Sequence, residues 1–248
     1  MTNIFDNLHI GAAPTGIGAL PSGGFGFGPV GRFYVYDIVP LTLSAVNIAA
    51  SQTPGSAALT LTAGTGITKG KDPSGNTIYI LDVPRGVKIS SGGVDTGITF
   101  TVKGYDTYGV PLTSTVTGSS GSSVTTLKAF KSVLSITPSG AVATTASAGT
   151  SDVFGLPVCV VDAGYITNVK WNNTLAADAG TFVAAVGTIP STALLGDVRG
   201  TYTPSANASN GVRRLVVSIA LSDLNIGGEN ETAPLGQTVV GVLGQPQV

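Results

Sequence analysis

The stretch ITFTVKGYDTYGVPLTSTVTG, residues 98–118, contains the pattern on which the fold prediction depends. Apolar and β-branched residues alternate with polar ones in ITFTVKGYD (98–106) and again in TSTVTG (113–118). Such alternation predicts strands with one buried face. The residues between them include aspartate, glycine and proline, which favour turns. The expected unit is therefore a pair of short strands separated by a turn.

Fifteen segments of this kind occur along the chain, counting these two, and indicate about twelve to fourteen short strands. The further candidates are 32–38, 42–50, 57–63, 77–83, 86–90, 122–130, 132–138, 141–147, 152–162, 165–171, 181–187, 196–204 and 213–223. Turn clusters separate them, of which DPSGN (72–76) is the clearest, and the only glutamates are Glu229 and Glu231. We therefore expect an all-β protein with an antiparallel sandwich or jelly-roll-like body over residues 32–223. A division into two β halves near residue 150 is left open.

The composition removes most chemical classes of function. Only 10% of the 248 residues are charged, the net charge is −1, and there is one cysteine and one histidine. These counts exclude a disulfide framework, a cysteine-based zinc site within one chain and a basic nucleic-acid surface. Each apolar stretch is interrupted well before the ~20 residues of a membrane span. We expect no enzyme activity, no cofactor, no metal, no nucleic-acid partner and no membrane partner.

Both ends of the sequence differ from the body. Residues 1–31 are rich in glycine and proline, contain FGFG at 25–28, and show neither strand nor helix periodicity. Such a segment orders only against something else, so it is either a disordered terminus or an arm that packs on a neighbouring subunit. In the second interpretation Phe25 and Phe27 are candidate contact residues. Residues 224–248 are expected to form an extended tail, and no signal peptide precedes the body.

Residue types able to support catalysis or ligand binding have simpler structural interpretations. Asp106, Asp152 and similar aspartates fall beside expected turns, where aspartate usually caps its own backbone. Cys159 lies in the apolar sequence LPVCVV and is expected to be a small buried residue. Trp171 is either a half-buried aromatic at a strand end or a platform for a sugar.

Arginine is distributed unevenly. Three of the five arginines, Arg199, Arg213 and Arg214, lie within GDVRGTYTPSANASNGVRR (196–214). Arginine forms bidentate pairs with carboxylates, which suits fixed ion pairs at subunit contacts. This cluster is either a solvated hairpin end or a contact surface, and we predict that these three residues contact a partner or another subunit.

Four segments resemble a family of virion proteins of tailed phages. They are GYDTYGVP (104–111), KAFKSVLSI (128–136), DVFGLP (152–157) and the stretch from DVRGTYTP to GVRRL (197–215). They occur in order, and the resemblance covers about residues 98–220.

The resemblance implies a structural component of the virion, in particular a capsid decoration or cement protein. Its partners would be the major capsid protein and further copies of itself, with a trimer expected at the three-fold positions of a shell. A chain poor in charge would make contacts that salt screens little. Three alternatives remain: a tail or head-fibre component that binds a host receptor or glycan, a tail-tube or connector protein, and an enzyme with two converging carboxylates.

Overall fold

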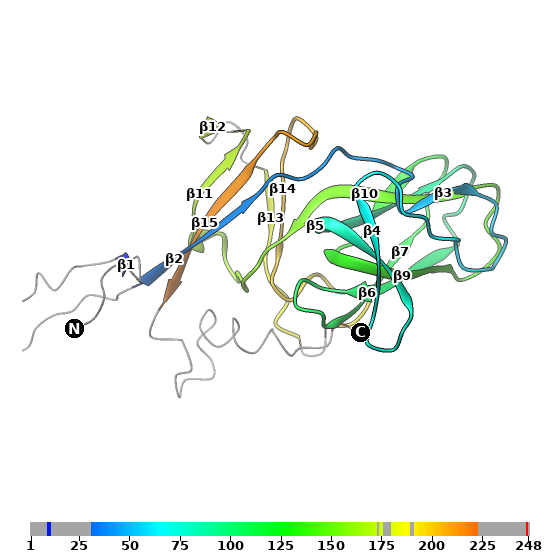
Figure 1. Cartoon of the computed structure of the whole chain (residues 1–248), viewed down its shortest axis with the longest axis horizontal. Coiled ribbons are helices and arrows are strands. Elements are labelled where there is room, and N and C mark those ends of the chain that lie inside the picture. The colour runs from blue at the N-terminus through cyan, green and yellow to red at the C-terminus, as the bar shows by residue number, and fades with distance from the viewer. Residues whose placement is uncertain are drawn as a thin grey trace, which may run out of the picture.

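The computed structural model describes residues 9–10, 31–172, 174–175, 180–188, 191–222 and 247. These residues form two antiparallel sheets that follow one another along the long axis of the molecule (Figure 1). The all-β prediction with an antiparallel sandwich-like body is confirmed. Most of the expected arm (1–31) and tail (224–248), including Phe25 and Phe27, lies outside the described residues.

The smaller sheet has five strands and is assembled from both ends of the body. Its order is β1 (His9–Ile10), β2 (Gly31–Ile38), β15 (Leu215–Ser222), β11 (Ile166–Trp171) and β12 (Thr174–Leu175). β2 and β15 pair along their whole lengths, from Gly31 opposite Ser222 to Ile38 opposite Leu215. The first long strand of the body is thus hydrogen-bonded to the last one.

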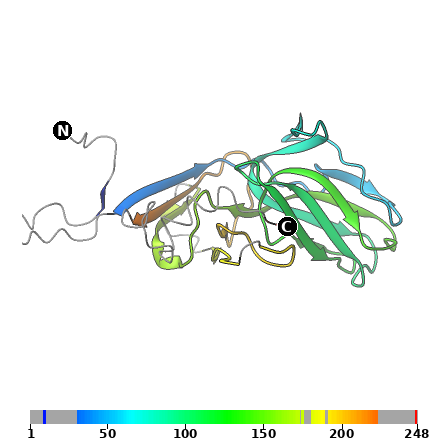
Figure 2. The same cartoon turned by 90° about the horizontal axis from the view of Figure 1, so that it is seen from below.

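The larger sheet has ten strands and curls around its own core (Figure 2). Its order is β13 (Thr181–Val183), β14 (Thr201–Thr203), β10 (Ala146–Gly155), β5 (Thr77–Ser91), β9 (Phe130–Pro138), β6 (Thr99–Tyr105) and β7 (Pro111–Thr117). Three short strands lie off this path: β3 (Ala49–Gln52) beside β10, and β4 (Ile67–Lys71) and β8 (Ser123–Thr125) beside β5. A single 3₁₀ turn, η2 (Ala163–Tyr165), is the one helical element among the described residues.

Two apolar cores correspond to this division. The first is enclosed by the larger sheet and includes Ile48, Ile89, Phe100, Phe130 and Ile136. The second lies where the two sheets meet and combines Phe154 and Tyr202 with residues of β11 and β15. β10 contributes to both cores, with Ala148 in the first and Phe154 in the second. β2 nevertheless belongs with strands that lie more than a hundred residues later in the sequence, because it pairs with β15.

The strand pair at 98–118 has the expected alternation. β6 and β7 are paired from Thr99–Thr117 to Tyr105–Pro111, with Phe100 and Val102 fully buried. Asp106 closes the intervening turn, because its carboxylate accepts from the backbone N–H groups of Tyr108 and Val110. The DPSGN turn is confirmed as well, since Gly75 has a φ of 84° and Asp72 accepts from the N–H groups of Ser74 and Asn76.

Several expected strand boundaries are wrong. The candidates at 77–83 and 86–90 form the single strand β5, within which the register shifts between Ile80 and Arg85. Pro84 lies in this shift, where its missing N–H removes no ladder bond. The candidate at 152–162 is a strand only as far as Gly155, although Leu156 to Val160 are buried. The candidate at 57–63 forms no strand, and that at 42–50 contributes only the start of β3.

Candidate contact surface

A buried ion-pair cluster joins the turn after β6 to the residues that precede β14. Arg199 Nη1 donates to Asp106 Oδ2 over 2.7 Å, and Arg199 Nη2 lies 3.8 Å from Asp197 Oδ1. The Arg199 Nε–H donates to the carbonyl oxygen of Leu156, and its guanidinium lies over the ring of Tyr108. Only 1% of Arg199 is exposed. The prediction that Arg199 contacts a partner is therefore wrong, because its side chain is buried and binds groups within the chain.

The cluster brings together residues from four segments quoted in the sequence analysis, 104–111, 128–136, 152–157 and 197–215. Asp106 belongs to the first segment, Ala129 to the second, Leu156 to the third, and Asp197 and Arg199 to the fourth. Asp197 accepts from the backbone N–H of Ala129 over 3.1 Å, which links the second segment to the fourth. The segments are thus far apart in sequence but are joined through one polar centre.

Burial and opposite charges act against each other in this cluster. Burial raises the pKa of Asp197, and the neighbouring Arg199 opposes that shift. Burial would lower the pKa of Arg199, but Asp197 and Asp106 together raise it above its usual range. Nearby, burial lowers the pKa of Lys128 to about 8, and Asp197 limits the shift. The Lys128 ammonium donates to the carbonyl oxygen of Ser191 over 3.0 Å.

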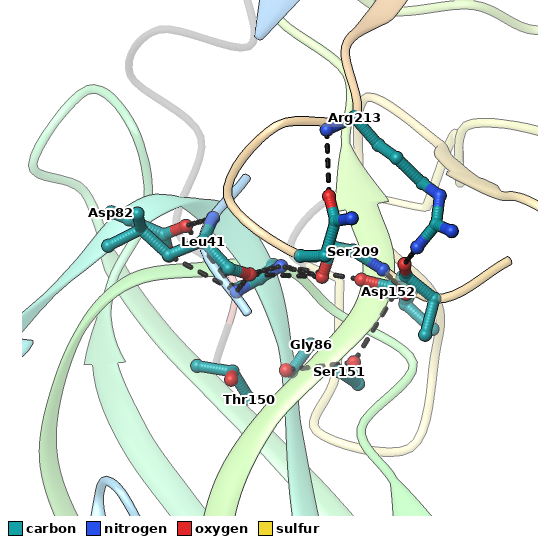
Figure 3. Close-up of polar contacts among 12 residues, drawn as sticks. Leu41, Asp82, Gly86, Thr150, Ser151, Asp152, Ser209 and Arg213 are labelled. Carbon is teal, nitrogen blue, oxygen red and sulfur yellow. Dashed lines mark hydrogen bonds and ion pairs between the residues drawn. The ribbon is translucent and has the colours of Figure 1, made fainter. Parts of the chain in front are cut away.

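A second arginine, Arg85, joins the linker after β2 to the larger sheet through Asp82, Asp152 and Ser209, which are labelled in Figure 3. Arg85 is 1% exposed. Its Nη1 lies 3.3 Å from Asp82 Oδ1, and its Nη2 lies 3.3 Å from Asp152 Oδ1. Its Nη2 also donates to the Ser209 hydroxyl over 3.0 Å, and that hydroxyl donates to the Leu41 carbonyl oxygen over 3.0 Å. Asp82 and Asp152 in turn accept from the backbone N–H groups of Leu41 and Ser209. This network fixes residues 41 and 209 side by side.

Exposed apolar residues lie beside this network. Together with two neighbouring arginines they form what we call the contact surface, which consists of Val39, Leu41, Val212, Arg213 and Arg214. Val39 is 46% exposed, Leu41 40% and Val212 77%. The backbone N–H of Gly211 donates to the carbonyl oxygen of Pro40 over 3.1 Å, which holds the two parts of the surface together. Large apolar side chains exposed next to one another commonly mark an interaction site.

Arg213, which is partly buried, and the exposed Arg214 follow Val212 in sequence, and both are oriented by contacts within the chain. Arg213 donates to the carbonyl oxygen of Ala208, and its backbone N–H donates to the Asn210 side chain. Arg214 forms a bidentate pair with Asp37 and lowers the pKa of that carboxyl. Half of the Arg214 side chain remains exposed. Of the three predicted arginines, the structure thus places two at one surface.

Trp171 is hydrogen-bonded to the loop that precedes the second half of this surface. It is 3% exposed, and its indole N–H donates to the carbonyl oxygens of Ala206 and Asn207. It is therefore neither half-buried nor a platform for a sugar. Cys159, as expected, is buried.

The described part of the chain has a further candidate site. An open groove of about 290 Å³ is lined by residues of β4, β5, β9 and the 105–109 turn, including Lys71, Tyr105 and Lys131. Its Asp72 accepts from the Tyr105 hydroxyl and the Asn76 amide, so the carboxylate is already occupied. The described residues contain no group of three or more potential metal ligands. Within them, no helix has the length and apolar character needed to cross a membrane.

Comparison with known proteins yielded no match to a family model, a curated protein or a solved structure.

Proposed function

We propose that this chain is a non-enzymatic structural protein of a virion, which decorates the outer surface of a phage capsid and stabilises contacts between major capsid proteins. The observation that carries the proposal is the contact surface. Its exposed apolar centre and two arginines are held on a rigid base by the Arg85 network. A partner that fits it presents apolar groups bordered by carboxylates or backbone carbonyls.

The resemblance of four segments to phage virion proteins supports the same proposal. Because those segments meet at the Arg199 cluster, they have a shared physical role in tying separate parts of the larger sheet and its loops together. A protein that reinforces a shell needs such a rigid β body and no reactive groups. We further propose that it acts as a homo-oligomer, with a trimer matching the three-fold positions of a capsid.

The first test is the copy number of the protein in purified virions, measured by quantitative mass spectrometry against the major capsid protein. Decoration predicts hundreds of copies in a simple ratio to the shell protein. A few copies per particle would instead favour the tail or head-fibre alternative, with a receptor or glycan as ligand. Absence from virions would overturn both.

The second test is binding to capsids that lack the protein. Purified protein is added to such capsids, and the bound fraction and the temperature of capsid disruption are measured together. Decoration predicts saturable binding and a higher disruption temperature. Light scattering of the free protein gives the oligomeric state, for which we expect a trimer.

A further inference from the structure

The open groove of about 290 Å³ is bordered by two turns of the larger sheet, at 72–76 and 106–110. Each turn is closed by its own aspartate, Asp72 in one and Asp106 in the other. The hydroxyl of Tyr105 donates to Asp72 over 2.9 Å and thereby ties the second turn to the first. The borders of the groove are thus fixed by hydrogen bonds within the chain.

The groove is lined by two apolar side chains of β5. Ile78 and Ile80 share one face of this strand, because side chains two residues apart in a strand point the same way. Gly70 of β4 lies opposite Ile78, and a Cβ on this glycine would lie 2.8 Å from Ile80 Cδ1. Gly70 therefore leaves room for both isoleucines. They are only partly buried, so an apolar group that enters the groove would remove more of their surface from water.

Two lysines also line the groove, and neither has a carboxylate partner. The Lys71 ammonium donates to the Thr77 hydroxyl over 3.0 Å, and the Lys131 ammonium donates to the carbonyl oxygens of Leu81 and Asp82. Each ion pair among the described residues is formed by an arginine. Burial lowers the pKa of Lys131, and a bound carboxylate would offset that cost to its charged form.

The aspartates of the groove are already engaged by other donors. Asp106 pairs with the buried Arg199 over 2.7 Å. Asp72 accepts from two backbone N–H groups, the Asn76 side-chain amide and the Tyr105 hydroxyl. With Arg199 counted as the partner of Asp106, two ammonium groups remain in the groove for one carboxylate. The groove therefore combines an apolar floor with a small excess of positive charge.

We propose that this groove binds an acidic segment of a partner protein, in which a carboxylate side chain stands next to an aliphatic one. The carboxylate accepts from Lys131 and Lys71, and the aliphatic group covers Ile78 and Ile80. The volume lies at the lower limit of about 300 Å³ for pockets that enclose small molecules, and the groove is open, which suits side chains of a longer segment. A nucleic acid would leave the apolar floor unused. This inference goes beyond the proposed function and does not depend on it.

Nuclear magnetic resonance of the isoleucine methyl groups tests the site directly. The full chain, with isotope-labelled isoleucine δ1 methyls, is titrated with the peptide Gly-Leu-Asp-Leu-Gly, blocked at both ends. We expect saturable shifts of the Ile78 and Ile80 methyls, with no shift of Ile219, which is buried in the second core. A peptide with asparagine in place of aspartate should bind about tenfold more weakly, and so should one with alanine in place of both leucines.

A set of lysine variants assigns the charge contribution. Lys71→Gln and Lys131→Gln should each weaken peptide binding about two- to fivefold. Lys69→Gln is the matched control, because Lys69 is exposed on the same strand as Lys71 but lies over the ring of Tyr79 and does not line the groove. It should bind the peptide as the wild type does. Thermal denaturation checks that each variant is folded, and the titration of the wild-type chain needs no substitution.

Several outcomes would overturn the proposal. They are absence of shifts at Ile78 and Ile80, equal binding of the asparagine peptide, and equal effects of the three lysine substitutions. Inorganic phosphate and a short oligothymidylate are titrated in parallel. If either shifts the same methyls as strongly as the peptide does, the groove is a general anion site and the assignment to an acidic protein segment is wrong.

Discussion

Arg199 and Asp106 are separated by 93 residues in sequence, yet Arg199 Nη1 lies 2.7 Å from Asp106 Oδ2, with both side chains excluded from solvent. Asp106 closes the turn between β6 and β7, and Arg199 lies just before β14. The pair therefore ties one end of the larger sheet to the turn beside its last strand.

Replacing Arg199 is expected to destabilise the fold strongly. Arg199→Met removes the cation and leaves Asp106 and Asp197 buried without compensation, which should lower the free energy of unfolding by about 3–5 kcal/mol. Urea denaturation measures the change. Arg199→Lys, which keeps the charge but lacks the planar fork, should be intermediate.

Arg214→Met is the matched control for Arg199→Met. Its ion pair with Asp37 is largely exposed, so its loss should change stability little. An equal loss of stability in both variants would contradict the special role of the buried cluster.

The lowered pKa of Lys128 predicts that the free energy of unfolding rises with pH in the alkaline range. Its pKa in the folded protein is about 8, below the ordinary 10.5, because burial disfavours the ammonium. Between these values the unfolded chain binds more protons than the folded one, so the free energy of unfolding should increase by up to about 1.4 kcal/mol per pH unit.

The Lys128→Met variant isolates this contribution. Denaturation is compared with wild type at several pH values between about 8 and 9.5, below the range in which tyrosines ionise. The wild-type curve should rise relative to the variant. Parallel curves would contradict the assignment of the slope to Lys128.

Gly149 is expected to be required for the crossing of the linker over β10. A Cβ at Gly149 would lie 1.9 Å from the Ser44 carbonyl oxygen, and that oxygen accepts from the Thr150 N–H over 2.9 Å. Gly149→Ala should therefore cost about 1–3 kcal/mol or more. Gly97→Ala, where a Cβ has no neighbour within 4 Å, is the control and should be nearly neutral. Thermal denaturation of both variants measures the two changes in stability.

Val212 provides the sharpest test of the contact surface. Val212→Asp introduces a charge at its most exposed apolar residue and should weaken capsid binding at least about tenfold without affecting the fold. Leu194→Asp is the matched control, because Leu194 is 74% exposed but lies outside the surface. Binding isotherms on decoration-free capsids measure both. Equal weakening, or none, would exclude this surface as the capsid contact.

Local patterns in the sequence were sufficient for the strand class and for several turns. The alternation in 98–118 and the DPSGN turn specify structure over a few residues, through side-chain direction and backbone preference. The burial of Cys159 could be predicted from the apolar residues on either side of it. The division of β5 into separate candidates at 77–83 and 86–90 was wrong, because a continuous strand with a register shift depends on the neighbouring strands rather than on the local sequence.

The pairing of distant segments was decided only by the tertiary structure. Arg199, Arg213 and Arg214 are near one another in sequence, and nothing local distinguishes them. Folding directs Arg199 into a buried pair with Asp106, while Arg213 is only partly buried and half of the Arg214 side chain stays exposed beside Asp37. The sequence by itself determined that the chain is built of short antiparallel strands with little reactive chemistry. Which strands pair, which charges are buried and which apolar residues remain exposed depend on contacts across a hundred residues or more, which short-range patterns do not encode.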